Sequence, residues 1–400
     1  MVYSISIQLE PKNPYLCAKF IPMKRLLIVI TLLVGCVSLE AQGTSFWQKV
    51  NRLLTKPAVV DTTCIYQPKP CFALGLFTTG QEANFDVDVN YGVDLGDGYS
   101  FEGNSCFSLN ENLCKKIGLE VDYGNVGLGY GVEVGHKSAV KKRSFGFNIL
   151  GKSWGFHLNY YKITNPFTSK LTIEDQDGEV FYQDEFSPEE QASLQNFTLD
   201  GYYVFNNKRF VYPAAYKMCL IQRHTAGSWM LTARYMQGKL YNSPEAALDS
   251  YNLLDCVSTM QASIGGGYSV NFVLWHKDPV GARDEKLRNL TVNLTAMPVL
   301  TVFNYLKTTS YEYDAEGNCI GEDDSKVLCY PMPNYIGSTA VSLTMGRLYF
   351  STQFTYNRFY FRSRDAFDAS RLDIPYDVDN LSFTGTFRDW IVKGLLIYRF

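Results

Sequence analysis

Carboxylates recur on alternate positions in the first third of the chain, in segments whose other parity is apolar. They are Asp86, Asp88, Asp94, Glu120, Asp122 and Glu133. Lys116, Arg234 and Lys393 offer cations on matching positions of similar segments. If these faces share one interior, an acidic wall could select cations or hold a ligand. The same charges could instead form ion pairs that fill the interior. Both interpretations stay open.

A second set of side chains could support acyl transfer. Ser144, His157 and Asn159 fall on one parity of two neighbouring segments. A serine activated by a histidine is a minimal hydrolase centre, although a polar interior contains such residues without any catalysis. No metal-ligand spacing, phosphate loop or nucleophile elbow occurs. We therefore predict a protein without enzymatic activity, cofactor or metal, with a hydrolase as the alternative.

Composition limits the class of protein. The 400 residues carry a net charge of -3, which argues against a nucleic-acid partner. Aromatic residues make up 15% and charged residues 19%, yet mean hydropathy is only -0.13. Beyond residue 40 no apolar run is long enough for a spanning helix. Apolar residues alternate with polar ones instead, which is typical of strands with one face in lipid.

The C-terminus shows this alternation most clearly. Trp390, Tyr398 and Phe400 share one parity with aliphatic residues, whereas Lys393 and Arg399 occupy the other. The stretch has about the length of a tilted strand that crosses a bilayer. Its closing aromatic-x-Phe resembles the assembly signal of bacterial outer-membrane barrels. We expect Trp390, Tyr398 and Phe400 to form such a signal and to engage the barrel assembly machinery.

Three glycine-led dipeptides predict two-residue hairpin turns: Gly124-Asn125, Gly151-Lys152 and Gly346-Arg347. Glycine at the first turn position suits a type II′ turn. Each turn fixes a register that puts apolar residues opposite apolar ones, and a slip of one residue would scramble the faces. The predicted pairs include Val121 with Leu128, Phe147 with Phe156, and Leu343 with Phe350.

Long polar segments alternate with short turns along residues 71–400. We predict an all-β fold, a closed antiparallel transmembrane β-barrel of about 12 strands (10–14), with short turns in the periplasm and long loops outside. Strands should start near residues 84, 116, 126, 143, 153, 200, 228, 259, 288, 335, 347 and 380. This count treats residues 197–222 as one distorted strand and places a β-bulge near Arg388. Val87 and Val89 should then meet lipid.

The N-terminal region predicts export. Residues 1–22 are interpreted as a start-site extension, 23–41 as a cleavable signal peptide, and 42–70 as a periplasmic segment. Leu33-Val34-Gly35-Cys36 alternatively resembles a lipoprotein box with Cys36 as the lipidated residue. Cys319 and Cys329 lie in one polar loop, where they could be paired or free.

Several segments carry a family resemblance. Residues 202–206, 212–216 and 222–228 are similar to the central signature of an uncharacterised outer-membrane family of Bacteroides-type bacteria, domain-of-unknown-function family 4421. Residues 265–268 and 398–400 also resemble it, although the family's usual serine is Thr225 here. The resemblance covers most of residues 60–400. It implies an outer-membrane barrel of a Gram-negative bacterium and no known activity.

These patterns predict a monomeric outer-membrane barrel in contact with the bilayer and lipopolysaccharide. Its role would be that of a narrow, porin-like channel, a binding pore or a structural barrel with an acidic, polar lumen. The alternative is an outer-membrane lipid hydrolase that uses Ser144, His157 and Asn159. The sequence specifies neither a ligand, nor a partner protein, nor whether the lumen is open.

Overall fold

The computed structural model describes residues 60–68, 72–94, 100–111, 114–134, 141–164, 167–175, 180–186, 193–241, 256–278, 286–313, 319–364 and 377–400. All of them belong to one compact unit, residues 57–400. The predicted extension, the signal peptide, Cys36 and most of the segment 42–70 lie outside the described residues and stay predictions.

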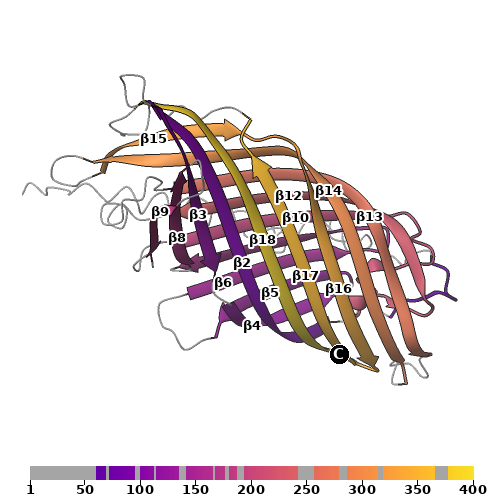
Figure 1. Ribbon diagram of the computed structural model, residues 1–400. Coiled ribbons are helices and arrows are strands. Elements are labelled where there is room, and N and C mark those ends of the chain that lie inside the picture. Colours follow the sequence, from indigo (N-terminus) through magenta and orange to yellow (C-terminus); the bar gives the residue numbers. More distant parts are fainter. Residues whose placement is uncertain are drawn as a thin grey trace, which may run out of the picture. The chain divides into compact units, whose positions relative to one another are not determined.

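Twelve strands of the described chain close into an antiparallel barrel, in which each pairs with the next and β18 pairs with β2 (Figure 1). The all-β barrel prediction is therefore confirmed. The strands are β2 (Phe72–Asp94), β4 (Cys114–Tyr123), β5 (Val126–Glu133), β6 (Lys141–Leu150), β7 (Trp154–Thr164), β10 (Ser193–Val204), β12 (Ala226–Tyr241), β13 (Cys256–Lys277), β14 (Arg288–Tyr313), β16 (Met332–Met345), β17 (Leu348–Arg362) and β18 (Asp377–Arg399).

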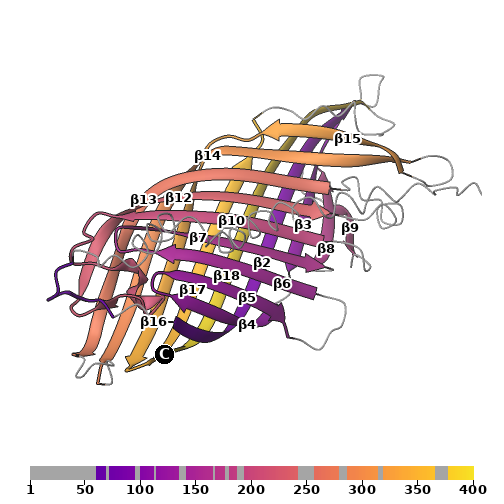
Figure 2. The ribbon, with the colours of Figure 1, turned by 180° about the vertical axis from the view of Figure 1, so that it is seen from behind.

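The remaining strands extend the wall or lie inside it. β3 (Ser100–Glu111) pairs with β2, followed by β8 (Phe167–Asp175) and β9 (Val180–Phe186), while β15 (Cys319–Leu328) pairs with β14 (Figure 2). β1 (Ile65–Tyr66) and β11 (Ile221–Gln222) form a separate two-stranded sheet. Among the described residues, no helix has the length and apolarity needed to cross a membrane.

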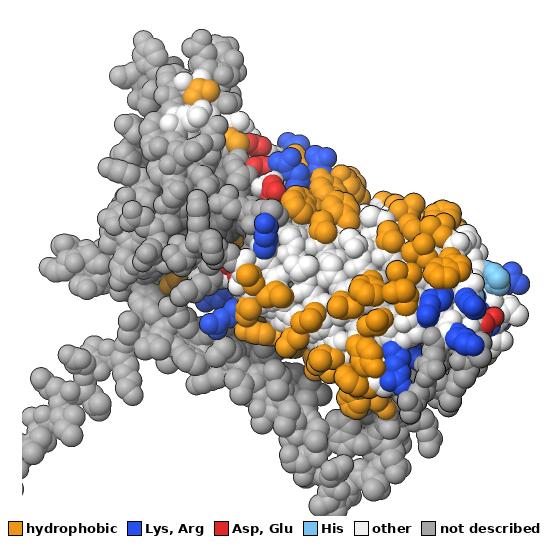
Figure 3. Space-filling model, turned by 90° about the horizontal axis from the view of Figure 1, so that it is seen from below, with side chains coloured by type: hydrophobic (Ala, Val, Ile, Leu, Met, Phe, Trp, Pro, Cys, Tyr) orange, Lys and Arg blue, Asp and Glu red, His pale blue; other side chains and the backbone are white. Residues whose placement is uncertain are grey.

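The barrel wall is apolar outside and polar inside. On β14, for example, Leu294 is 48% exposed while Asn293 and Thr295 are buried. Apolar side chains spread over the outer wall in Figure 3. An apolar outer surface of this extent is unfavourable in water and favourable in lipid. The outward residues include Leu74, Leu76, Leu119, Val121, Leu128, Trp229, Ile264 and Leu274.

The hairpin turns at Gly124 and Gly346 form as predicted. Both glycines have a positive φ, 57° and 62°, and the registers pair Val121 with Leu128 and Leu343 with Phe350. The register at Gly151 was predicted wrongly, because residues 151–153 all lie in the connection. Phe147 faces Leu158 instead of Phe156. A shift of two residues keeps every side chain on its predicted face, since the period is two.

The C-terminal strand closes the barrel. Its outer face carries Trp390, Tyr398 and Phe400, and the Phe400 amide donates to the Phe72 carbonyl at 3.0 Å. The predicted β-bulge near Arg388 is wrong: the register with β2 runs unshifted from Ser382 to Arg399. Phe383 and Phe387 therefore lie on the inner face. Past the hydrocarbon layer the outer face meets water, so apolar side chains turn inward there.

The prediction for the first strand was wrong for the same reason. β2 starts at Phe72 instead of residue 84, with Leu74 outward and Phe77 inward. No register shift separates this part from Asp86 and Asp88, which therefore share the outer face with Arg388. Arg388 Nη2 lies 2.5 Å from Asp86 Oδ2. The prediction that Asp86 and Asp88 line the lumen is not met, and the side chains of Val87 and Val89, predicted to face lipid, lie outside the described part of the structure.

β15 separates the two cysteines that might have been paired. Cys319 begins this strand and Cys329 follows its end. Ten extended residues span roughly 33 Å at about 3.3 Å each, far beyond the reach of a disulfide. Cys329 is free in the structure.

Candidate functional site: a plugged lumen with a cavity

The connection between β10 and β12 folds back into the barrel. We call residues 205–225 the plug. β10 ends at Val204, and Ser228 Oγ accepts the Asn206 amide at 2.9 Å. A 3-10 turn, η1 (Tyr212–Ala215), follows with a proline at its start, where the missing N–H is harmless. The prediction that residues 197–222 form one distorted strand is therefore wrong.

The plug has an apolar centre of its own. Phe210, Val211, Leu220 and Ile221 are almost fully buried. Residues 60–68 join them, because β1 pairs with β11 and Ile65 packs against Val211 and Leu220. The described chain thus closes the short-turn end of the barrel with two segments that are far apart in sequence.

Gln222 holds the plug together from within. Its Oε1 accepts the Val211 amide at 2.9 Å, and its Nε2 donates to the Arg209 carbonyl at 2.6 Å and the Cys64 carbonyl at 3.3 Å. A fully buried amide satisfied in this way fixes the conformation of the backbone around it. This residue belongs to the family-like segment 222–228.

Hydrogen bonds tie the plug to the inner wall. Tyr216 Oη lies 2.9 Å from both Asn293 Oδ1 and Ser338 Oγ. Gln353 Nε2 donates to the Tyr216 carbonyl at 3.1 Å, and Asn271 Nδ2 donates to the Val211 carbonyl at 2.7 Å. These partners come from β14, β16, β17 and β13, so the plug is held by four adjacent strands of the twelve.

A chain of charges completes the attachment. Lys217 Nζ lies 2.6 Å from Glu120 Oε1 and also pairs with Asp122. Glu120 Oε2 accepts from Lys393 Nζ at 2.8 Å. The side chains of Lys217, Glu120 and Asp122 are only 7%, 3% and 10% exposed. Such buried pairs are sustained only when every charge has its partner.

Gly127 makes room for this ammonium. A Cβ built at Gly127 would collide with Lys217 Nζ and with Asp122 Oδ1. The predicted acidic wall is thus partly a binding surface for the plug. Sequence reasoning placed Glu120, Asp122 and Lys393 but missed Lys217. The available signal was its position directly after the family-like segment 212–216.

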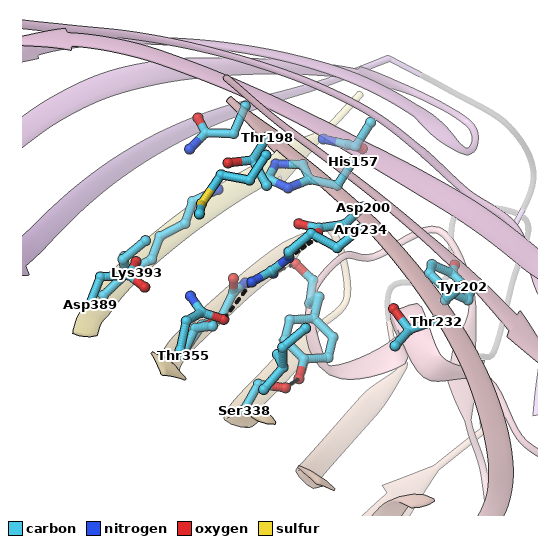
Figure 4. A pocket seen from close by; sticks show the side chains of 18 of the residues that line it. His157, Thr198, Asp200, Tyr202, Thr232, Arg234, Ser338, Thr355, Asp389 and Lys393 are labelled. Atoms are coloured by element: carbon cyan, nitrogen blue, oxygen red, sulfur yellow. Dashed lines mark hydrogen bonds and ion pairs between the residues drawn. The ribbon is translucent and has the colours of Figure 1, made fainter. Parts of the chain in front are cut away.

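Beyond the plug the lumen holds a cavity of about 260 Å³ (Figure 4). One side is polar and comes mainly from β7, β10 and β12. The other comes from β14, β16, β17 and β18 and combines an apolar cluster with polar residues such as Ser338, Asn357 and Asp389. The floor is the plug itself, through Tyr212, Pro213, Tyr216 and Lys217. The polar side includes His157, Asn159, Thr198, Asp200, Thr232 and Arg234, and the apolar residues of the other side include Met297, Ile336, Phe359, Phe387 and Ile391.

Arg234 forms the second charged contact of the cavity. It pairs with Asp200 on the neighbouring strand, and its Nη1 donates to Asn357 Oδ1 at 2.8 Å across the lumen (Figure 4). Arg234 was predicted to line the lumen. Asp200 was missed, because it fell in the segment interpreted as a distorted strand.

The predicted hydrolase set does not assemble. His157 and Asn159 line the cavity, but Ser144 is level with Tyr161 on β7, four residues from His157. Four residues span roughly 13 Å along a strand. No hydrogen bond joins Ser144 to His157 among the described residues, so the arrangement lacks the nucleophile–base contact that acyl transfer needs.

Three further predicted residues lie elsewhere. Lys116 is buried and opposes Glu133 in the register, with its Nζ 3.5 Å from Gln81 Oε1. Glu133 Oε2 accepts the Lys142 amide at 3.0 Å. Asp94 belongs to β2, but its side chain lies outside the described part of the structure. The described residues contain no group of three potential metal ligands.

Fold and site together define a β-barrel with a lipid-type outer face, whose lumen is filled at one end by its own chain. The chain belongs to the family described as domain of unknown function DUF4421, whose model matches residues 59–376. The comparison with curated proteins gave no match.

Solved structures with some similarity are outer-membrane proteins. The outer-membrane protease OmpT from Escherichia coli is 9% identical with a TM-score of 0.34, covering 82% of this chain and 97% of that one. The β domain of the Bordetella autotransporter BrkA is 10% identical with a TM-score of 0.27, covering 80% and 99%.

Proposed function

We propose that this protein is an outer-membrane barrel that acts as a closed, ligand-binding pore. The observation that carries the proposal is the plug, which closes the short-turn end while leaving a cavity of about 260 Å³ behind it. An open diffusion channel needs a continuous aqueous path. Here buried residues of the plug, such as Phe210 and Val211, occupy that path.

The location follows from the outer surface and the loops. An apolar girdle around a closed barrel suits a membrane, and short turns are periplasmic in outer-membrane barrels. The plug then lies at the periplasmic end and the cavity opens toward the long loops. We further propose export through the signal peptide at residues 23–41, insertion by the barrel assembly machinery, a monomer surrounded by phospholipid and lipopolysaccharide, and an origin in a Bacteroides-type bacterium.

A ligand in the cavity would touch the plug directly. Tyr212, Tyr216 and Lys217 line the cavity and also belong to the plug. The plug is attached by hydrogen bonds and ion pairs such as Lys217–Glu120, and a bound ligand can shift such an equilibrium by its differential affinity. Binding and opening are thus coupled through these three residues.

Conductance in planar bilayers tests this function. The wild-type protein should be electrically silent, whereas a variant with residues 207–219 replaced by a short Gly-Ser linker should conduct steadily. Lys208→Ala is the matched control, because Lys208 is exposed and its loss should leave the pore closed. Equal steady conductance of the wild type and the linker variant would overturn the closed pore. Labelling of wild-type protein but not Ser144→Ala by a serine-reactive phosphonate would favour the hydrolase.

A further inference from the structure

The cavity resting on the plug is lined by charged residues and by an apolar cluster. We propose that it binds a small zwitterion with a large apolar side chain, as in a free aromatic or branched aliphatic amino acid. This inference rests on the proposed binding pore and names its ligand class. It is carried by the balance and accessibility of the charges and by an apolar cluster in the cavity wall.

The charges of the cavity balance. Its described lining contains three acidic residues and three basic residues: Glu120, Asp200 and Asp389, and Lys217, Arg234 and Lys393. A ligand with a single charge would upset this balance in a region of low dielectric. A ligand with one charge of each sign would preserve it.

Only one charge of each sign is accessible among the paired residues of the cavity. The side chains of Asp200 and Lys393 are each 27% exposed, whereas those of Glu120, Lys217 and Arg234 are 3%, 7% and 10% exposed. Asp200 is paired with Arg234 and Lys393 with Glu120, but both keep part of their charged surface exposed. An incoming ammonium would therefore meet Asp200, and an incoming carboxylate would meet Lys393.

The lining also contains polar atoms that lack partners among the described residues. Asn148 Oδ1 and Gln81 Nε2 are buried without a hydrogen bond, and both residues line the cavity. One is an acceptor and the other a donor, and leaving either unsatisfied costs about 1–3 kcal/mol. His157 is exposed to the cavity directly opposite Asp200 in the register. The two unpartnered atoms are themselves buried within the wall, so it is His157, Asp200 and Lys393 that offer exposed polar groups to a ligand.

The apolar wall receives the rest of the ligand. Met297, Ile336 and Phe359 are buried together, with Phe387 packed against them. They belong to β14, β16, β17 and β18, and Figure 4 shows Ser338 and Thr355 of β16 and β17 across the cavity from His157 and Asp200. A volume of about 260 Å³ falls slightly below the roughly 300–1,000 Å³ of drug-sized ligand sites. It suits one amino acid.

Calorimetric titration of the full-length refolded protein tests the ligand class with five probes. Four share a phenyl ring: L-phenylalanine (zwitterion), phenylacetate (anion), 2-phenylethylamine (cation) and 2-phenylethanol (neutral). The fifth, glycine, is a zwitterion without the apolar group. L-Phenylalanine should bind at least tenfold more tightly than each of the others. Equal or tighter binding of any other probe, or no binding of L-phenylalanine, would overturn the proposal.

Two variants test the assignment of the charges. Asp200→Asn should weaken L-phenylalanine at least tenfold and leave phenylacetate nearly unchanged, and Lys393→Gln should weaken L-phenylalanine and leave 2-phenylethylamine nearly unchanged. Val392→Ala on the lipid face is the control for folding in detergent. If neither variant changes the affinity for L-phenylalanine, the assignment fails. The wild-type protein would still show no conductance in bilayers in that case. A wrong ligand class can therefore be distinguished from a wrong assignment of the closed pore.

Discussion

Lys217 pairs with two buried carboxylates at once. Its ammonium lies between Glu120 and Asp122, and Glu120 has a second cation in Lys393. The four charges alternate in sign in the order Asp122, Lys217, Glu120 and Lys393. Taking charges out of water is unfavourable, and the attraction between partners offsets this only while all are present. Asp122 depends most on Lys217, because Glu120 keeps Lys393.

We predict that Lys217→Met destabilises the barrel by about 3–5 kcal/mol, the usual effect of leaving a buried charge without its partner. The double variant Lys217→Met/Asp122→Asn should recover most of the loss, because the remaining Glu120–Lys393 pair is neutral. Urea unfolding of the refolded protein, followed by tryptophan fluorescence, measures both. A single variant as stable as the wild type would show that the ion pairs contribute nothing to closure.

Side chains alternate between the two faces along a strand, but the outer face changes from apolar to polar along its length. On β18 the odd positions from Phe383 to Arg399 face inward. In the part near the C-terminus the outer even positions are apolar, as in Leu396 and Tyr398, whereas farther along they are polar, as in Thr386 and Arg388. The solvent outside the wall changes from lipid to water between these parts, and the preferred side chain changes with it.

Two glycines differ in whether the backbone requires glycine, and alanine substitutions test this difference. Gly346 has a φ of 62° in a hairpin turn, so Gly346→Ala should destabilise by about 1–2 kcal/mol through the left-handed backbone. Gly337 lies within β16, and a Cβ there would meet nothing within 4 Å, so Gly337→Ala should be neutral or stabilising by up to about 1 kcal/mol. Urea unfolding compares them. The opposite order would contradict the assigned turn.

The whole molecule has two unlike ends. The long-loop end carries the strand extensions β3, β8, β9 and β15. The short-turn end carries the plug and many basic residues, and Figure 3 shows basic side chains at both borders of the apolar wall. Cations next to a bilayer suit the phosphate groups of its lipids. The basic positions at the short-turn end are Lys152, Lys208, Arg209, Arg223, Lys277, Arg288 and Arg347.

Labelling of whole cells tests the proposed orientation. Lys326 on β15 and Lys208 in the plug are both exposed lysines, at opposite ends of the barrel. In a cysteine-free background, Lys326→Cys should react with an impermeant maleimide and Lys208→Cys should react only after the outer membrane is permeabilised. Strong labelling of Lys208→Cys alone on intact cells would invert the orientation.

The alternation of side chains was sufficient to predict the barrel wall. Every second residue of segments such as 117–132 must suit either lipid or the lumen, so the period of two in the sequence determines which side each residue faces. The same pattern set the turns at Gly124 and Gly346 and the outer face of Trp390, Tyr398 and Phe400. Local chemistry decides these features, and local chemistry is visible in sequence.

Only the tertiary structure decided what fills the lumen. Whether an apolar parity meets lipid or the interior depends on the height of the segment relative to the membrane, so Asp86 and Asp88 were placed on the wrong face. The plug has no strand period, because its backbone is satisfied by side chains of the wall such as Asn271 and Gln353. The pairing of Lys217 with Glu120 joins residues 97 positions apart (217 − 120). Contacts of this kind arise from closure of the barrel, which no local pattern encodes.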